Sequence, residues 1–259
     1  MTYRDILVFL DGSKDNEVRL DFALSLAKEH GARLTGVDVN SAAAFGGEWS
    51  QRAQTVEESF QAKAHQAGIS IRFRVANREA TGWKNLYAHH ADLLIATQPN
   101  PEASGLILPG VPEDVLMSAG VPMIVLPRQW KPESADQNIV IAWSPSSQAT
   151  RAVHDAMPIL TQASKVTVFA FDPPSDDSDA DIKLLCDHLL AHGVVAETDQ
   201  WLDTGELSAI DALFASRAME DAAMIVAGAY SHSRFRETVF GGVTKDLLHQ
   251  LSVPVLVSH

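Results

Sequence analysis

Two stretches of nine residues decide the fold of this chain: DILVFLDGS at residues 5–13 and NIVIAWSPS at residues 138–146. Each is a short apolar run that ends in small and polar residues. Three more pairs share the same spacing: ADLLIAT at 91–97 with AAMIVAG at 222–228, GVPEDVL at 110–116 with GVTKDLL at 242–248, and VPMIV at 121–125 with VPVLV at 253–257. The spacing stays between 131 and 133 positions, which identifies the 259-residue chain as a tandem duplication.

Within each copy, short apolar runs alternate with segments of helical periodicity. The runs 6–10, 93–96, 139–143 and 224–227 are almost wholly apolar, which is typical of parallel strands covered by helices on both faces. The helical segments are marked by Val18, Phe22 and Leu26 in the first copy and by Val153, Met157 and Leu160 in the second. The pattern predicts an α/β fold in which each copy is a doubly wound sheet of five parallel strands joined by right-handed crossovers.

The domain boundary falls in a polar segment, residues 128–137, that contains Pro132. We therefore expect two domains, residues 1–130 and 136–259. The formal net charge of −13 is divided unevenly: the chain up to residue 131 holds 13 basic and 15 acidic residues, and the remainder holds 7 and 18. Such acidity argues against nucleic-acid and membrane partners. A single cysteine, Cys186, and the lack of a signal peptide or membrane span favour a cytoplasmic protein.

Ligands of open doubly wound sheets bind beyond the carboxyl ends of the strands, where the strand order reverses. In the first copy this rule selects Asp11, Gly12, Asp38 and Thr97. In the second copy it selects Ser144 and the segment that starts at Gly228.

The segment 228–244 of the second copy, GAYSHSRFRETVFGGVT, is the most informative in the sequence. A glycine ends a strand, a loop with Arg234 and Arg236 follows, and Gly241-Gly242 opens a helix that carries Lys245. Small residues before a helix let an anion approach the free backbone amides. The pattern indicates a phosphate site. The alternative is a basic loop that offsets local acidity or packs against the other copy.

This segment resembles the nucleotide signature of the universal stress protein family, in its tandem form with two domains in one chain. The signature is Gly, two residues, Gly, nine residues, Gly, and then Gly, Ser or Thr; Gly228, Gly241 and Gly242 match it, and Ser231 stands at the second glycine. The segments 121–125 and 253–257 look like the family's last strand. The resemblance implies flavodoxin-like domains with strand order 3-2-1-4-5. It also implies a pseudo-dimer within the chain, with further homodimerisation as an option.

ATP-binding members of that family hold the adenine and ribose near an Asp that ends the first strand, and the phosphates on the glycine loop. The first copy has this Asp, Asp11, but its loop at 97–101 reads TQPNP, and proline offers no amide donor. It is therefore interpreted as a degenerate site made of Asp11, Gly12, Asp38, Thr97 and Gly110. The second copy has the loop but carries Ser144 in place of the Asp. The resemblance implies ATP or a related nucleotide, with Mg, in the second domain, on these residues: Ser144, Gly228, Ser231, Arg234, Arg236, Gly241, Gly242, Val243 and Thr244.

Two functions remain open. The first is a stress-response or signalling module that binds a nucleotide or another small anion, with at most weak ATP hydrolysis, since the sequence offers no Walker lysine and no paired metal carboxylates. The alternative is a scaffold, or a protein that binds another small ligand, acting through protein contacts. A weak metal candidate is the pair His188 and His192, one helical turn apart. The competing explanation for this pair is the wet face of an amphipathic helix.

Overall fold

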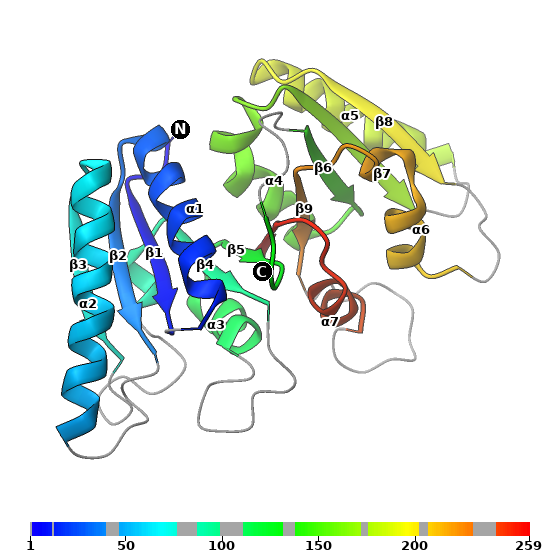
Figure 1. Cartoon of the computed structure of the whole chain (residues 1–259). Helices are drawn as coiled ribbons and strands as arrows, with labels where there is room; N and C mark the ends of the chain where they lie inside the picture. The colour runs from blue at the N-terminus through cyan, green and yellow to red at the C-terminus, as the bar shows by residue number, and fades with distance from the viewer. Residues whose placement is uncertain are drawn as a thin grey trace. The chain divides into compact units, whose positions relative to one another are not determined.

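The computed structural model describes residues 2–11, 13–39, 47–76, 87–98, 111–131, 138–171, 176–201, 207–229 and 242–259. The chain divides into two compact units, Met1–Lys131 and Pro132–His259 (Figure 1). Each unit is described below by itself.

The first unit alternates strands and helices along the chain. Its elements are β1 (Asp5–Leu10), α1 (Asp15–His30), β2 (Arg33–Asp38), α2 (Gly47–Ala67), β3 (Ile71–Val75), η2 (Ala88–His90), β4 (Leu93–Thr97), α3 (Val111–Ala119) and β5 (Met123–Leu126). All neighbouring strands are parallel, and they lie in the order β3-β2-β1-β4-β5. The strand order 3-2-1-4-5 is thus confirmed for this unit.

The second unit repeats the plan. Its elements are β6 (Asn138–Trp143), α4 (Ser147–Leu160), β7 (Lys165–Phe171), α5 (Asp176–Ala191), β8 (Ala196–Trp201), α6 (Ala209–Ala215), η3 (Arg217–Met219), β9 (Met224–Gly228), α7 (Gly242–His249) and β10 (Val255–Ser258). The strands are again parallel and lie in the order β8-β7-β6-β9-β10. Counted from β6, this is also the order 3-2-1-4-5.

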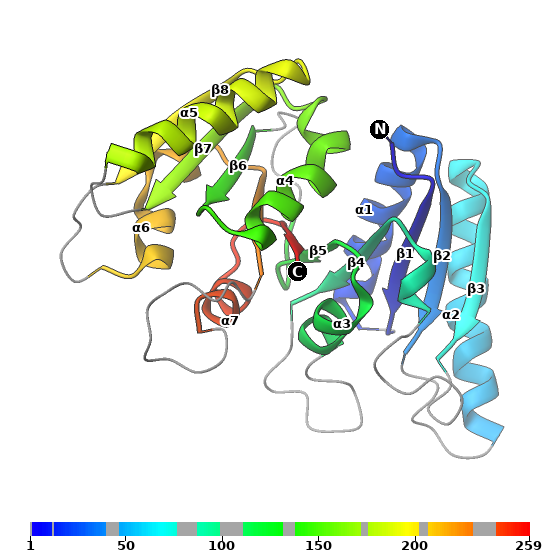
Figure 2. The ribbon, with the colours of Figure 1, turned by 180° about the vertical axis from the view of Figure 1, so that it is seen from behind.

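Helices cover both faces of each sheet. In the first unit α1 and α2 pack against each other over β1, β2 and β3, while α3 and η2 contact each other on the opposite face (Figure 2). In the second unit α4 and α5 share one face, and α6 and α7 pack together on the other. Right-handed crossovers produce this division, because the chain moves to one side of the central strand with its first two helices and to the other side with the rest.

The predicted central strands are confirmed. The run 6–10 in β1 and the runs 93–96 in β4 and 224–227 in β9 are buried throughout, whereas β6 ends in two half-buried residues. Strands covered on both faces have no wet side, which explains why their sequences do not alternate between polar and apolar residues.

The helical segment marked by Val18, Phe22 and Leu26 is confirmed as α1. Of these markers Leu26 is buried and Val18 and Phe22 are half-buried, and the other buried residues of this helix include Leu20, Ala23 and Ala27. The ring of Phe22 lies edge-on to Trp130, with ring centroids 5.8 Å apart.

Candidate functional site at the carboxyl ends of the strands

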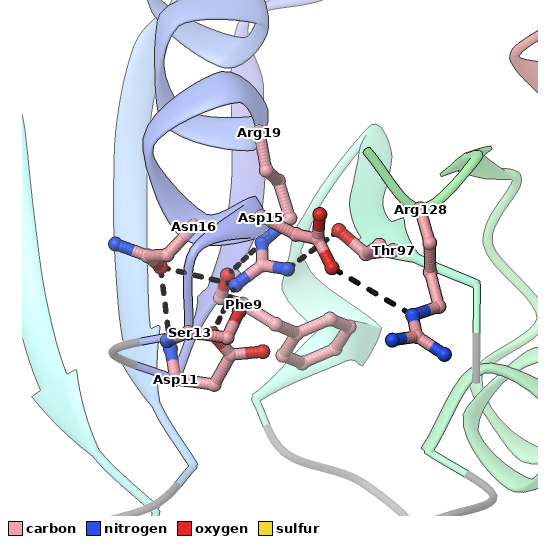
Figure 3. A network of polar contacts seen from close by, with 8 residues as sticks. All are labelled: Phe9, Asp11, Ser13, Asp15, Asn16, Arg19, Thr97 and Arg128. Atoms are coloured by element: carbon pink, nitrogen blue, oxygen red, sulfur yellow. Dashed lines mark hydrogen bonds and ion pairs between the residues drawn. The ribbon is translucent and has the colours of Figure 1, made fainter. Parts of the chain in front are cut away.

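A buried arginine organises the switch point of the first unit, where β1 and β4 end side by side. The side chain of Arg19, from α1, is only 2% exposed. Its Nε donates to the carbonyl oxygen of Phe9 at 2.6 Å, and its Nη1 donates to Thr97 Oγ1 at 2.6 Å. Figure 3 shows the guanidinium between the end of β1, the first turn of α1 and Thr97. The guanidinium thus links the ends of β1 and β4, the neighbouring strands at which the strand order reverses.

The same guanidinium neutralises the charge of Asp11, the carboxylate that sequence analysis selected. Arg19 Nη2 lies 2.9 Å from Asp11 Oδ1 and 3.0 Å from Asn16 Oδ1 (Figure 3). The backbone N–H of Ser13 also donates to Asp11 Oδ1, at 2.9 Å. Burial acts to raise the pKa of Asp11, but Arg19 and the hydrogen bonds from Ser13 outweigh it, so the pKa lies below its usual value. Asp11 is therefore ionised and already paired within its own unit.

Arg128 and Asp15 form the rim of this network. Arg128 Nε lies 3.9 Å from Asp15 Oδ2 (Figure 3). Asp15 Oδ1 also accepts the backbone N–H of Gln129 at 2.8 Å. Gln129 has a φ of 56°, in the left-handed region that few residues adopt without cost. The hydrogen bond from its amide to Asp15 holds the segment after β5 against the start of α1.

The other first-unit candidates are placed as follows. Asp38 is fully buried at the end of β2, where it pairs in register with Leu10 of β1. Thr97 ends β4 and is joined to Asp11 through Arg19. Gly12 and Gly110 lie outside the described residues.

The switch point of the second unit is built from smaller residues. Ser144 follows β6 and is exposed, and Gly228 ends β9. A Cβ on Gly228 would lie 2.4 Å from the backbone nitrogen of Ala149 and 2.6 Å from the carbonyl carbon of Gln148. Real Cβ atoms do not approach backbone atoms so closely, so the packing of α4 on β9 already requires glycine here. This close approach accounts for Gly228 without any reference to phosphate.

The two switch points differ at matched positions. The buried residues of α1 and α4 follow each other at the 133-residue spacing, Leu20 with Val153 and Ala23 with Ala156. Arg19 then corresponds to Ala152, which is buried as well. In the first unit, the Arg19 guanidinium and Thr97 fill the space between the helix and the end of β4. In the second unit Ala152 and Gly228 stand at the corresponding positions, and the backbone of α4 comes close to the end of β9. Sequence analysis missed Arg19; the signal was a charged residue opposite an alanine on a buried helix face.

The remaining nucleotide candidates lie in or before α7. Gly242 and Val243 begin this helix, and Thr244 is buried in its first turn. Ser231, Arg234, Arg236 and Gly241 lie outside the described residues. What the structure adds is that a helix starts at Gly242, the last residue of the signature.

Two residues near Ser144 support the start of α4 and the end of β6. Ser146 caps α4, because its Oγ accepts the backbone N–H of Ala149 at 3.2 Å. The indole Nε1 of Trp143 donates to Asp181 Oδ2 of α5 at 2.6 Å. Trp143 thus ties the sheet to α5.

The histidine pair on α5 is close together. The rings of His188 and His192 have centroids 4.8 Å apart, and His154 of α4 lies 5.2 Å from His188 on its other side. Nevertheless, the described residues contain no group of three or more His, Cys, Asp or Glu placed to hold a metal ion. His188 is half-buried, whereas its two ring neighbours His154 and His192 are exposed, so the wet helix face is in keeping with the structure for His192.

Comparison with known proteins adds the family. The fold and the switch-point site define a doubly wound α/β protein of the flavodoxin-like type. Residues 2–127 match the model of the universal stress protein family. The match covers almost all of the first unit, which is thus a universal stress protein domain. No curated protein sequence matches the chain.

Solved structures share the fold over nearly the whole length. A universal stress protein from Archaeoglobus fulgidus DSM 4304 has a TM-score of 0.75 and 17% identity, with 98% of this chain and 97% of the other covered. A functionally unknown protein, PA1789 from Pseudomonas aeruginosa PAO1, has a TM-score of 0.65 and 14% identity, with 99% and 92% covered. The cytoplasmic domain of a prokaryotic cation chloride cotransporter has a TM-score of 0.58 and 11% identity, with 98% and 95% covered. At such identities the likeness concerns the fold.

Among the helices in the described part of this chain, none combines the length and the apolar character that crossing a membrane requires.

Proposed function

We propose that this universal stress protein binds ATP or a related nucleotide, with Mg, in its second unit, and that it hydrolyses the nucleotide slowly or not at all. In this proposal residues 136–259 form the nucleotide domain and residues 1–130 form a domain with a degenerate site. The observation that carries the proposal is the start of α7 at Gly242, the last residue of the glycine signature. Free amides in the first turn of a helix, together with its dipole, favour phosphate.

The contrast between the two units supports the choice of the second. In the first unit a guanidinium already pairs with Asp11, and Pro99 and Pro101 stand where the loop would need amide donors. In the second unit Ser144 is exposed at the end of β6, and Ala152 stands where the first unit has Arg19. The loop between β9 and α7 supplies Arg234 and Arg236 from a half of the chain that is otherwise poor in cations. These arginines are suited to the negative charge of phosphates.

Calorimetric titration of the full chain with ATP and Mg tests the proposal. We expect saturable binding, and we expect the double variant Arg234→Ala/Arg236→Ala to bind at least about tenfold more weakly, because charge-assisted hydrogen bonds are lost. The matched control is Arg72→Ala/Arg74→Ala, which removes two exposed arginines of β3, spaced alike, from the first unit. This control should bind like the parent chain.

Two results would contradict the proposal. An absence of heat with tens of micromolar protein would favour the scaffold function instead. Equal weakening in both double variants would show that bulk charge, and not the loop of the second unit, attracts the nucleotide.

A further inference from the structure

A cavity of about 250 Å³ lies between α4 and α5 of the second unit. It is lined by Trp143, Thr150, Val153, His154, Asp181, Leu184, Leu185 and His188. A water molecule occupies about 30 Å³ in the liquid, so the cavity corresponds to about eight waters. This volume suits a ring system of one or two rings.

The walls of the cavity are largely apolar and aromatic. The Trp143 indole, Val153 and Leu185 supply buried or half-buried surface, while Leu184 is 67% exposed at the rim. An exposed leucine beside an indole gives a flat apolar guest favourable contact on both faces.

Polar groups in the cavity are placed to accept or share hydrogen bonds. Asp181 Oδ2 accepts the Trp143 indole N–H at 2.6 Å, and a carboxylate can accept further hydrogen bonds. His188 Nε2 is buried and has no hydrogen-bond partner, which is a costly state for a polar atom. Burial, and then His192 and His154, lower the pKa of His188, so its imidazole is neutral at neutral pH. Among the eight described lining residues, Asp181 therefore carries the formal charge, which is negative.

The first unit provides an internal comparison at the matched helix positions. At the 133-residue spacing, Thr150 and His154 correspond to Glu17 and Asp21 of α1. Lys63 Nζ of α2 lies 2.6 Å from Asp21 Oδ1 and 4.0 Å from Glu17 Oε1, so an ion pair bridges the two helices. In the second unit a hydroxyl and an imidazole stand at these positions, and both line the cavity. The polar character of this part of the fold thus differs between the two copies.

We propose that the cavity between α4 and α5 binds a small neutral or cationic aromatic molecule that carries an N–H or O–H donor. The flat ring packs on Trp143, Val153 and the leucines, and the donor reaches His188 Nε2 or Asp181. The negative charge of Asp181 disfavours anionic guests. The site is independent of the nucleotide site proposed above.

Indole is a suitable probe, and 1-methylindole is its matched control because methylation removes the donor. NMR titration of the full chain follows the Trp143 indole N–H and the His188 ring protons, assigned with Trp143→Phe and His188→Gln. We expect saturable shifts of both signals with indole and about tenfold weaker binding of 1-methylindole. Indole-3-acetate should also bind more weakly than indole, and Asp181→Asn should reduce that difference.

The variant Thr150→Trp places a large side chain at the exposed rim and should abolish the indole shifts while the amide spectrum stays that of a folded chain. Glu17→Trp, at the corresponding position of the first unit, should leave them intact. Saturating ATP should not displace indole. The proposal is overturned if indole shifts persist in Thr150→Trp, if indole and 1-methylindole bind equally, or if ATP competes with indole.

Discussion

The single buried side chain of Arg19 pairs with the polar groups at the switch point of the first unit. Its donors are divided among a backbone carbonyl, a carboxylate, an amide oxygen and a hydroxyl, all within 3.0 Å. A buried guanidinium is tolerated only when its N–H groups are satisfied in this way. The network therefore depends on all of its members, and removing the arginine would leave Asp11 with a charge that solvent reaches only in part.

The expected effect of Arg19→Met is a loss of about 3 kcal/mol in the free energy of unfolding, measured by urea denaturation. Asp11 is 23% exposed, which places the loss at the lower end of the range for broken buried pairs. Arg33→Met is the comparison, because the Arg33 side chain in its pair with Asp5 is 34% exposed and that of Arg19 is 2% exposed, and the loss should be far smaller. A double variant that adds Asp11→Ser should recover part of the stability. Additive losses would show that the two residues are not coupled.

Sequence alone could not place Arg19 in the site, although it did select Asp11 and Thr97. Arginines are normally exposed, and the residues that suggested the helix, Val18 and Phe22, directed attention to a neighbouring face. The information that was lacking is three-dimensional: which helix positions face the gap between β1 and β4. The 133-residue spacing contained a hint, because it sets Arg19 opposite Ala152.

Helix α4 and strand β9 illustrate the element scale. The first turn of α4 lies so close to the end of β9 that the backbone nitrogen of Ala149 would be 2.4 Å from any Cβ at Gly228. In the first unit the corresponding strand end carries Thr97, whose hydroxyl accepts a hydrogen bond from Arg19. The two copies thus share one fold but differ in how the helix packs on the strand end, α1 on β4 in the first unit and α4 on β9 in the second.

Gly228→Ala should lower the free energy of unfolding by about 1–3 kcal/mol, because the added methyl group forces α4 and β9 apart. Thermal or urea unfolding of the full chain measures this change. Thr97→Ala, at the corresponding position of the first unit, should cost about 1 kcal/mol through one lost hydrogen bond. If Gly228→Ala has no effect on stability but weakens ATP binding, the glycine serves the ligand and not the packing.

The strands were the most predictable elements, and the reason is physical. Runs such as 6–10 and 93–96 contain no polar residue because both faces of the strand are covered. The local sequence alone therefore predicts that these strands are buried. The order of the strands came from a family resemblance and from the repeat, since local sequence does not state which strands are neighbours. The segment 230–241 and Gly110 lie outside the described residues, so the phosphate loop remains a prediction from sequence.

At the scale of the whole molecule, each unit contains a histidine that resists protonation: His30 is buried in the first unit, and His188 is half-buried in the second. Burial lowers the pKa of His30 in the first unit, against an opposing effect of Glu29, and burial with two neighbouring imidazoles lowers that of His188 in the second. The unfolded chain would protonate both near the ordinary value of 6.5, whereas the folded chain does so only at lower pH. Between these values the unfolded state binds more protons.

The free energy of unfolding should therefore be highest above about pH 6.5 and fall as the pH is lowered below it. Urea denaturation at about pH 7.5 and about pH 5.5 measures the slope. His30→Gln and His188→Gln should each flatten it, and His65→Gln, which alters an exposed histidine of α2, should not. A slope that is unchanged in both buried-site variants would assign the pH dependence to other groups.

The pair of Arg19 with Asp11 also makes the neutralisation of Asp11 independent of dissolved cations. A dissolved cation leaves a carboxylate when it is diluted, but a guanidinium on the same chain keeps a fixed effective concentration beside it. Added salt screens exposed charges within a Debye length of about 8 Å at physiological ionic strength, and screens buried pairs much less. Exposed pairs such as Lys165 with Glu197 weaken as the ionic strength rises, while Asp11 stays neutralised from within.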